Sequence, residues 1–408
     1  MNPQEARNHR KYGVPIYGAS WLPAKVIFNQ EHPQKQGDDA AAADGATQDE
    51  SPIVSVDSTH YFVLSGGGGE GRTGIRNALL VAQFDLAANS LSDQPVARLE
   101  TGNDLPYRLA VHPGGEGLIC AMPNSCRWYE WDLIKHGDDH KVGLKTSEKE
   151  LPQLEGVGQQ LAMAFNKDGS ILALGDENGH LRVFRWPSME SIIDEPKAHS
   201  SVKDLDFSTS GSFLVSSGGG GPCRIWDLTS SSVIASLSKQ SDEVFGLCRF
   251  STSSQINSVM YTTVKHGKGG SIVTWDTKSW KRIASKHIVR EPISALSVSP
   301  DGSLLAVGTA EGDVLVLNSA TMRVHTVVRK AHITVVTAMG FSGTSRDLMS
   351  TSMDSSVRVT LITEKKSNGF SMWIIFLIII LAIAVYILTN NGMIPEETWS
   401  RLSSHLRN

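Results

Sequence analysis

The segment LSGGGGEGRTGIRNALLVAQF, residues 64–84, has glycine spacings that are typical of phosphate binding. Gly66–Thr73 reads G-x-x-x-x-G-R-T, a phosphate loop with arginine in place of lysine. Gly69, Gly71 and Gly74 read G-x-G-x-x-G, the dinucleotide pattern. Both patterns need a following helix whose N-terminal N–H groups face the phosphates. Because the β-patterned LLVAQF follows instead, the sequence argues against a nucleotide site.

Other kinds of chemistry have little support in the sequence. The four cysteines form no C-x-x-C pair and no Cys/His metal spacing. No Ser/His/Asp set and no paired carboxylates emerge as a motif, so a hydrolase or a transferase is disfavoured. The net charge of −4, with 20% charged residues, indicates no nucleic-acid partner. We therefore expect a protein that is not an enzyme and works by binding.

The chain repeats between residues 13 and 362 with a period of about 40 to 55 residues. The clearest unit, 202–238, has four short apolar stretches separated by turn residues, and its third stretch ends in Trp226-Asp227. This pattern is typical of one WD-type propeller blade. Related units predict an all-β fold, a seven-bladed WD-type β-propeller over residues 1–365. His199 and His332 are expected to be structural hydrogen-bonding residues.

Comparison of two repeats explains the glycine run. Ser217–Gly221 in the fourth unit and Ser65–Gly69 in the first have the same sequence, SGGGG, at the same position. Only the first unit continues with about ten extra residues before its next strand. The four glycines therefore belong to the repeat, and we expect function in the insertion, within the loop 65–77. A second insertion, residues 23–57, is polar and of low complexity, which predicts a disordered surface segment.

One apolar segment lies near the end of the chain. Residues 370–389, FSMWIIFLIIILAIAVYILT, contain no charged residue and predict one C-terminal transmembrane helix. Lys365 and Lys366 precede the segment, and the next basic residue is Arg401. By the positive-inside rule the propeller is then cytosolic, and residues 390–408 form a short lumenal tail.

A propeller with a single anchor and the loop GGGGEG-x-x-G-I-x-N resembles the SEC-twelve type of guanine-nucleotide exchange factor. The resemblance covers nearly the whole chain and is most specific over Gly66–Asn77; the opening YGVPIYGASW also looks like the family's first strand. It implies residence in the endoplasmic reticulum membrane and activation of a Sar-family small GTPase, the step that starts COPII coat assembly. COPII coat subunits are possible further partners.

The resemblance also implies roles for individual residues. The loop would be organised around a potassium ion held by Gly69, Glu70, Gly71 and Gly74. Ile75 and Asn77 would be the catalytic pair, an apolar wedge and a hydrogen-bonding group; Arg72, Thr73, Arg76 and Pro106 would contact the partner. The alternatives are loop packing for Ile75, a left-handed turn position for Asn77 and plain solvation for Glu70. We take Asn77 to be an exposed loop side chain.

The sequence departs from the family at Arg76, where proline is common. The departure bears on a competing class of function. A non-catalytic propeller scaffold of the endoplasmic reticulum that assists the exit of membrane cargo, such as phosphate transporters, would have the same anchor and propeller. Only the state of the inserted loop separates the two classes.

Overall fold

The structure is a computed structural model that describes residues 7–23, 26, 59–71, 73–136, 139–252, 259–363 and 372–390. The chain divides into two compact units, Met1–Ile362 and Thr363–Asn408. The first unit ends three residues before the boundary of 365 expected from the sequence. It contains all the described strands.

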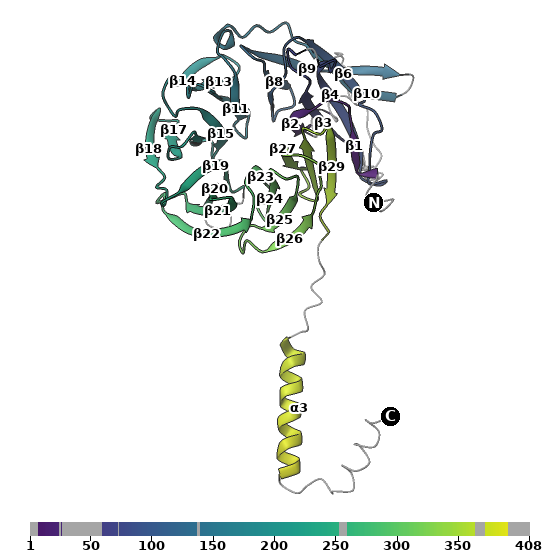
Figure 1. The fold of residues 1–408 in the computed structure, drawn as a ribbon, viewed down its shortest axis with the longest axis vertical. Helices are drawn as coiled ribbons and strands as arrows, with labels where there is room; N and C mark the ends of the chain where they lie inside the picture. Colours follow the sequence, from purple (N-terminus) through teal and green to yellow (C-terminus); the bar gives the residue numbers. More distant parts are fainter. Residues whose placement is uncertain are drawn as a thin grey trace, which may run out of the picture. The chain divides into compact units, whose positions relative to one another are not determined.

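Seven antiparallel sheets follow one another around a ring (Figure 1), so the all-β seven-bladed propeller is confirmed. Blade one contains β2 (Ile16–Trp21), β3 (Thr59–Gly66), β4 (Asn77–Asp85), β5 (Ser90–Leu91) and β6 (Ala97–Gly102). Blade two contains β7 (Arg108–Val111), β8 (Gly117–Ala121), β9 (Cys126–His136) and β10 (Asp139–Thr146), followed by the 3-10 turn η1 (Pro152–Leu154). Blade three contains β11 (Gln160–Phe165), β12 (Ile171–Asp176), β13 (Leu181–Arg185) and β14 (Glu190–Glu195).

The remaining blades repeat the same order from the centre outwards. Blade four contains β15 (Val202–Phe207), β16 (Phe213–Gly218), β17 (Arg224–Asp227) and β18 (Ser232–Ser236). Blade five contains β19 (Glu243–Phe250), β20 (Val259–His266), β21 (Gly269–Asp276) and β22 (Arg282–Val289). Blade six contains β23 (Ile293–Val298), β24 (Leu304–Thr309), β25 (Val314–Asn318) and β26 (Val324–Val328). Blade seven contains β27 (Val336–Phe341), β28 (Asp347–Ser352) and β29 (Ser356–Leu361) from the end of the propeller.

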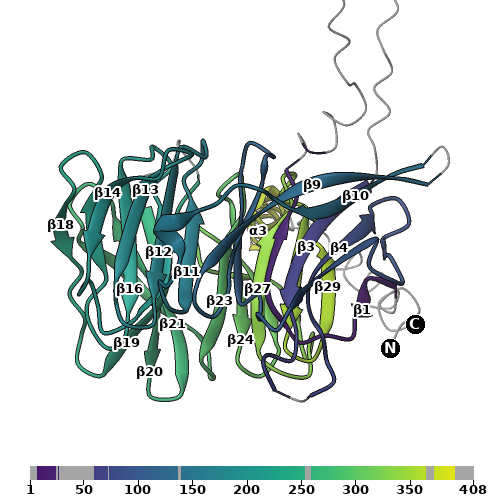
Figure 2. The same cartoon turned by 90° about the horizontal axis from the view of Figure 1, so that it is seen from above.

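The burial of each strand follows its place in the blade. The second strand of blade four, β16, is buried at five of its six positions, whereas the outermost strand β18 is mostly exposed. Middle strands are covered by the blades on both sides, and this explains why they read as apolar runs. Seen from above, the strands stand side by side through the thickness of the ring (Figure 2).

The WD hydrogen bonds form as the repeat predicts. His199 Nε2 lies 2.7 Å from the hydroxyl of Ser216, which also accepts a hydrogen bond from Trp226 Nε1 at 2.9 Å. His332 lies between the hydroxyls of Ser350 and Ser356, at 2.8 and 2.6 Å. The structural role expected for both histidines is confirmed. Burial lowers the pKa of each to about 4.

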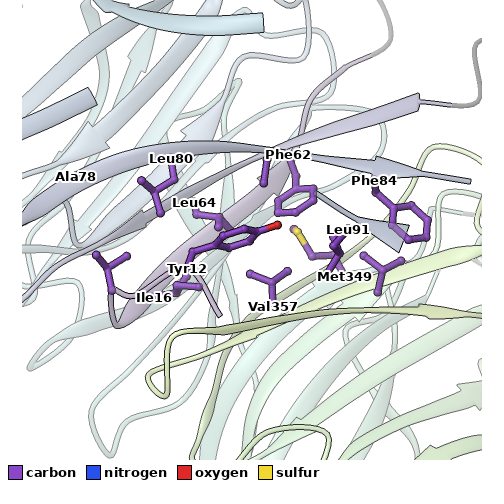
Figure 3. Packing of buried hydrophobic residues seen from close by; sticks show 13 residues of the cluster. Tyr12, Ile16, Phe62, Leu64, Ala78, Leu80, Phe84, Leu91, Met349 and Val357 are labelled. Carbon is purple, nitrogen blue, oxygen red and sulfur yellow. The ribbon is translucent and has the colours of Figure 1, made fainter. Parts of the chain in front are cut away.

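The first strand of the chain closes the seventh blade. β1 (His9–Lys11) pairs antiparallel with β29, with His9 opposite Arg358 and Lys11 opposite Ser356. The sequence leaves this closure open, because little chain separates Ile362 from the apolar segment at 370–389. The side chains of blades one and seven then pack together, as Figure 3 shows for Tyr12, Ile16, Met349 and Val357.

The insertion at 23–57 lies mostly outside the described residues. Val26 is the exception within its interior, and it is 4% exposed in the cluster that also contains Leu22 and Tyr61. The N–H of Val26 donates to the Pro23 carbonyl at 3.0 Å. Val26 therefore packs on the propeller, and the expected disorder of the insertion stays a prediction.

The second unit contains the helix α3 (Met372–Asn390). Within the ranges that the structure describes, no helix is both long and apolar enough to cross a membrane. The expected transmembrane helix over 370–389 is therefore not supported, although a helix does form there. Residues 390–408 lie outside the described residues, apart from Asn390.

Candidate functional site

The inserted loop joins β3 to β4 on the face of the ring where the innermost strands begin. Its first two residues repeat blade four. A Cβ added to Gly66 would lie 2.1 Å from the Pro15 carbonyl oxygen, and one added to Gly218 would lie 2.1 Å from that of Ser201. The next N–H, of Gly67 or Gly219, donates to the same carbonyl at 3.1 Å in both blades. The glycines therefore belong to the repeat, and the loop differs from blade four only after them.

Glycine is also needed where the insertion turns. Gly69 and Gly74 have φ of +76° and +73°, in the left-handed region that side chains disfavour. A Cβ on Gly67 would lie 2.2 Å from Asn77 Oδ1, and one on Gly68 would lie 2.0 Å from Thr73 Oγ1. The chain between β3 and β4 is thus folded tightly on itself. The conformation of this loop depends on the hydrogen bonds made by the Asn77 side chain.

Asn77 is the residue that fixes the loop. It is the first residue of β4, only 2% exposed, and its Oδ1 accepts a hydrogen bond from Gly69 N at 2.9 Å. Its Nδ2 lies 3.3 Å from Gly69 O, 3.1 Å from Gly102 O and 3.1 Å from Asn103 O. The exposed position expected for Asn77 is wrong, as is the left-handed turn alternative, because the residue lies in a strand. Asn77 therefore holds the loop from a buried position at the start of β4.

The tip of the loop presents one apolar side chain to solvent. Ile75 is 38% exposed, and its N–H donates to Thr73 Oγ1 at 3.3 Å. Next to it, Arg76 donates to both carboxylate oxygens of Glu100 on β6, at 2.9 and 3.1 Å. This ion pair ties the end of the loop to the fourth strand of the blade. It supplies a restraint at the position where the family commonly has proline.

The potassium ion implied by the family resemblance can be tested against the oxygen atoms that meet here. Three backbone carbonyls, of Gly69, Gly102 and Asn103, converge on Asn77 Nδ2, which has two hydrogens for three acceptors. Neutral carbonyl oxygens are also the ligands that bind a large monovalent cation, so the residues fit the ion. In the described part of the chain, no group of three His, Cys, Asp or Glu residues forms another kind of metal site.

The structure brings together most residues expected from the sequence. A surface hollow of about 420 Å³ is lined by Gly69, Glu70, Gly71, Gly74, Ile75, Arg76, Asn77, Glu100, Gly102 and Asn103. Glu70, Thr73 and Gly74 are exposed, whereas Pro106 is buried before β7. Arg72 lies outside the described residues. As a buried residue Pro106 is suited to shaping the backbone that enters blade two, and its contact with a partner stays a prediction.

Sequence reasoning missed Glu100, Gly102 and Asn103. They belong to the fourth strand of blade one and the link that follows, about 25 residues from the loop. The pairing of Asn77 with Gly102 brings them to the site, with β4 and β6 adjacent. Their only sequence signal is the repeat itself, because strands three and four of a blade always pair.

The two nucleotide patterns have no structural support. The loop leads into β4 rather than into a helix, so no helix N-terminus faces the glycines. The glycine run serves the blade turn and the Asn77 contacts instead.

The chain was compared with known proteins. The model of the anaphase-promoting complex subunit 4 WD40 domain matches residues 163–264. SEC12-like protein 2 of Arabidopsis thaliana is 50% identical over 371 residues, which cover 90% of this chain and 91% of that protein. SEC12-like protein 1 of the same plant is 32% identical over 292 residues, 71% of this chain and 72% of that protein. The guanine nucleotide-exchange factor SEC12 of Mus musculus is 23% identical over 397 residues, 83% of this chain and 94% of that protein.

The fold and the site define a WD-type seven-bladed propeller with a glycine-containing loop inserted in its first blade. The chain belongs to the SEC12-like family. Some members of this family are named as guanine nucleotide-exchange factors. The family resemblance inferred from the loop is confirmed.

Proposed function

We propose that this protein is a guanine-nucleotide exchange factor for a Sar-family small GTPase and that it starts COPII coat assembly at the endoplasmic reticulum. The observation that carries the proposal is the loop held by Asn77. A buried amide makes hydrogen bonds to Gly69, Gly102 and Asn103, and so presents Ile75 to solvent in one fixed position. Mouse SEC12, which the chain matches over most of its length, is named a guanine nucleotide-exchange factor.

Exchange is the acceleration of a dissociation, without bond making. An exchange factor binds the nucleotide-free GTPase more tightly than the loaded form, and that difference in affinity drives the nucleotide out. Ile75 is the exposed apolar group that can enter the partner near its nucleotide site. Asn77 is buried, so it is a positioning residue that acts through the loop. Because the loop is already ordered by its contacts, less conformational entropy is lost when the partner docks.

A potassium ion is part of the proposal, held by Gly69, Glu70, Gly71 and Gly74 as the family resemblance implies. Gly102 and Asn103 line the same hollow, and their carbonyl oxygens could complete its ligands. When bound, the ion would add positive charge among these carbonyl oxygens and stiffen the loop. The contribution of the protein is separate: Gly69 and Gly74 supply the turns, and Asn77 holds the loop to the link after β6.

Attachment to the endoplasmic reticulum membrane, with the propeller in the cytosol, is a further part of the proposal. It is supported by the uncharged residues 370–389 and by Lys365 and Lys366 before them. In sealed microsomes, added protease should digest the propeller and spare a small C-terminal fragment. A protected propeller would contradict this orientation, and with it access to a cytosolic GTPase.

The activity is tested by nucleotide release. The full chain, purified in detergent micelles, is mixed with a recombinant Sar-family GTPase that carries a fluorescent GDP analogue. Acceleration of release by the wild-type chain, lost in Asn77→Ala, supports exchange. If the wild-type chain binds cargo membrane proteins without accelerating release, the scaffold is the correct class.

A further inference from the structure

Two exposed apolar side chains belong to adjoining segments of blade seven. Ile333 is 73% exposed, the highest value for a large hydrophobic residue in the ranges that the structure describes, and Met353 is 43% exposed. Ile333 belongs to the link between β26 and β27, and Met353 to the turn between β28 and β29. The N–H of Ile333 donates to Asp354 Oδ2 at 2.8 Å, so the link and the turn are joined.

This pair, which we call the blade-seven patch, lies on the same face of the ring as the inserted loop. The link Tyr12–Pro15 connects the two places. Tyr12 N donates to Ser355 O in the turn that contains Met353, at 3.0 Å, and Gly67 N in the loop donates to Pro15 O at 3.1 Å. Three residues of extended chain span at most about 11 Å. The turn and the base of the loop are therefore close neighbours across the junction of blades seven and one.

The surface differs in character on the two sides of the loop. On the side of blade two, charged groups are paired with each other, Arg76 with Glu100 and Arg127 with Asp104. On the side of blade seven, the carboxylate of Asp354 accepts hydrogen bonds from backbone N–H groups and leaves the apolar side chains to face solvent. An apolar centre with a polar rim is the usual anatomy of a protein interface.

The loop alone is too small to bind a folded partner. A stable interface takes about 800 Å² and roughly 20–30 residues from each side. The inserted loop has about ten residues and one exposed large apolar side chain, Ile75, so a partner that it engages must also cover a neighbouring blade. The blade-seven patch is the apolar surface joined to the loop.

We propose that Ile333 and Met353 form a second contact surface for the GTPase, which anchors the partner while the loop acts on its nucleotide site. This inference rests on the proposed exchange function. Contacts that are kept throughout the exchange reaction contribute affinity, whereas contacts made only with the distorted partner contribute rate. The blade-seven patch should therefore affect KM, and the loop should affect kcat.

The test measures nucleotide release by the full chain over a range of GTPase concentrations. Ile333→Asp and Met353→Asp should each raise KM at least tenfold and leave kcat within about twofold. Asn77→Ala should lower kcat. The matched control is Val244→Asp, which changes a side chain 46% exposed at the start of β19 in blade five, on the same face but away from the loop. Val244→Asp should leave both constants unchanged.

Three results would overturn the proposal. KM of both patch variants within twofold of wild type, with wild-type release intact, would refute the second contact and leave the exchange function standing. A wild-type chain without release activity would refute both. A wild-type dimer in analytical ultracentrifugation that Ile333→Asp dissociates, without a change in KM, would show that a second copy of the chain covers the patch. Unchanged melting temperatures of the variants exclude unfolding as the cause.

Discussion

The side-chain amide of Asn77 forms hydrogen bonds with both backbone groups of Gly69. Its Oδ1 accepts from the Gly69 N–H at 2.9 Å, and its Nδ2 donates to the Gly69 carbonyl oxygen at 3.3 Å. The amide thereby satisfies the same two backbone groups of Gly69 that a residue of a neighbouring strand would. Because Asn77 is buried and rigid in β4, the position of the loop is set by the core of the blade. Through this contact, a side chain remote from solvent sets the shape of the exposed loop.

Replacement of Asn77 should affect both exchange and stability. Asn77→Ala removes the donor and the acceptor that serve Gly69, and should reduce kcat for nucleotide release at least about tenfold, which corresponds to roughly 1.4 kcal/mol. Buried polar groups left without partners should also lower the free energy of unfolding by about 1–3 kcal/mol. Release kinetics and urea denaturation measure the two effects.

Asn77→Asp is the matched control, because aspartate has nearly the same side-chain shape as asparagine. It keeps Oδ1 for Gly69 N but removes the donor to Gly102 and Asn103, so it should also lose exchange. Wild-type kcat in Asn77→Asp would show that the contacts of Nδ2 are dispensable.

Proline at position 76 should preserve or raise the activity. Arg76→Pro removes the ion pair with Glu100, which is an exposed pair that contributes at most about 1 kcal/mol. Proline in turn restricts the loop before β4 and lowers the entropy of the unfolded chain. Release assays on Arg76→Pro are compared with Glu100→Gln, which breaks the same ion pair and also the longer contact of Glu100 with Arg98 at 3.9 Å. Loss of exchange in both variants would show that the ion pair itself is required.

Removal of the first strand should open the ring. A deletion of residues 1–11 removes β1, leaves the edge of β29 unpaired and lowers the free energy of unfolding by about 2 kcal/mol or more. An exposed strand edge also promotes aggregation. Deletion of residues 1–6, which keeps β1, is the control, and both are compared by thermal melting and light scattering. A deletion of 1–11 that melts like the control would mean that β29 needs no partner.

Stability should rise with pH between about 4 and 6.5. The folded pKa of His199 and of His332 is about 4, below the usual 6.5, so in this window the unfolded chain binds two more protons than the folded chain. Burial raises the pKa of Asp206 to about 7, which works in the opposite direction by one proton. Burial also lowers the pKa of His9 and raises the pKa of Asp347, and these two shifts act in opposite directions. The net difference of about one proton gives a slope of at most about 1.4 kcal/mol per pH unit.

Urea denaturation from pH 4.5 to 6.5 measures this slope. In His332→Asn the slope should fall towards zero, because the contributions of His199 and Asp206 then cancel. An unchanged slope in that variant would assign the pH dependence to other groups.

Exchange of the monovalent cation should change the rate of release. If carbonyl oxygens from Gly69 to Gly74, together with those of Gly102 and Asn103, hold potassium, replacing it by lithium at equal ionic strength should slow nucleotide release. The smaller ion fits these oxygens poorly. Limited proteolysis of the loop gives a readout that is independent of the GTPase. Cleavage should be faster in lithium, and equal cleavage in both salts would argue against the site.

The sequence by itself determined the repeat, the number of blades and the place of the inserted loop. These features are local: alternating apolar residues and turn residues recur in every unit, and Trp-Asp recurs in three of them. The SGGGG run shared by blades one and four showed which glycines belong to the repeat. Even the structural roles of His199 and His332 follow from their position in the unit.

Only the tertiary structure decided how the loop is held and how the ring closes. Asn77 meets Gly102 and Asn103 because β4 and β6 are adjacent, and β1 meets β29 although about 350 residues separate them in the chain. No local pattern encodes such pairings, because they follow from closing the ring. The apolar run at 370–389 is a different case. Its composition predicts a helix, which forms as α3, whereas no helix in the described residues is found long and apolar enough to cross a membrane. Closure of the ring is also what places Ile333 and Met353 beside the loop of blade one.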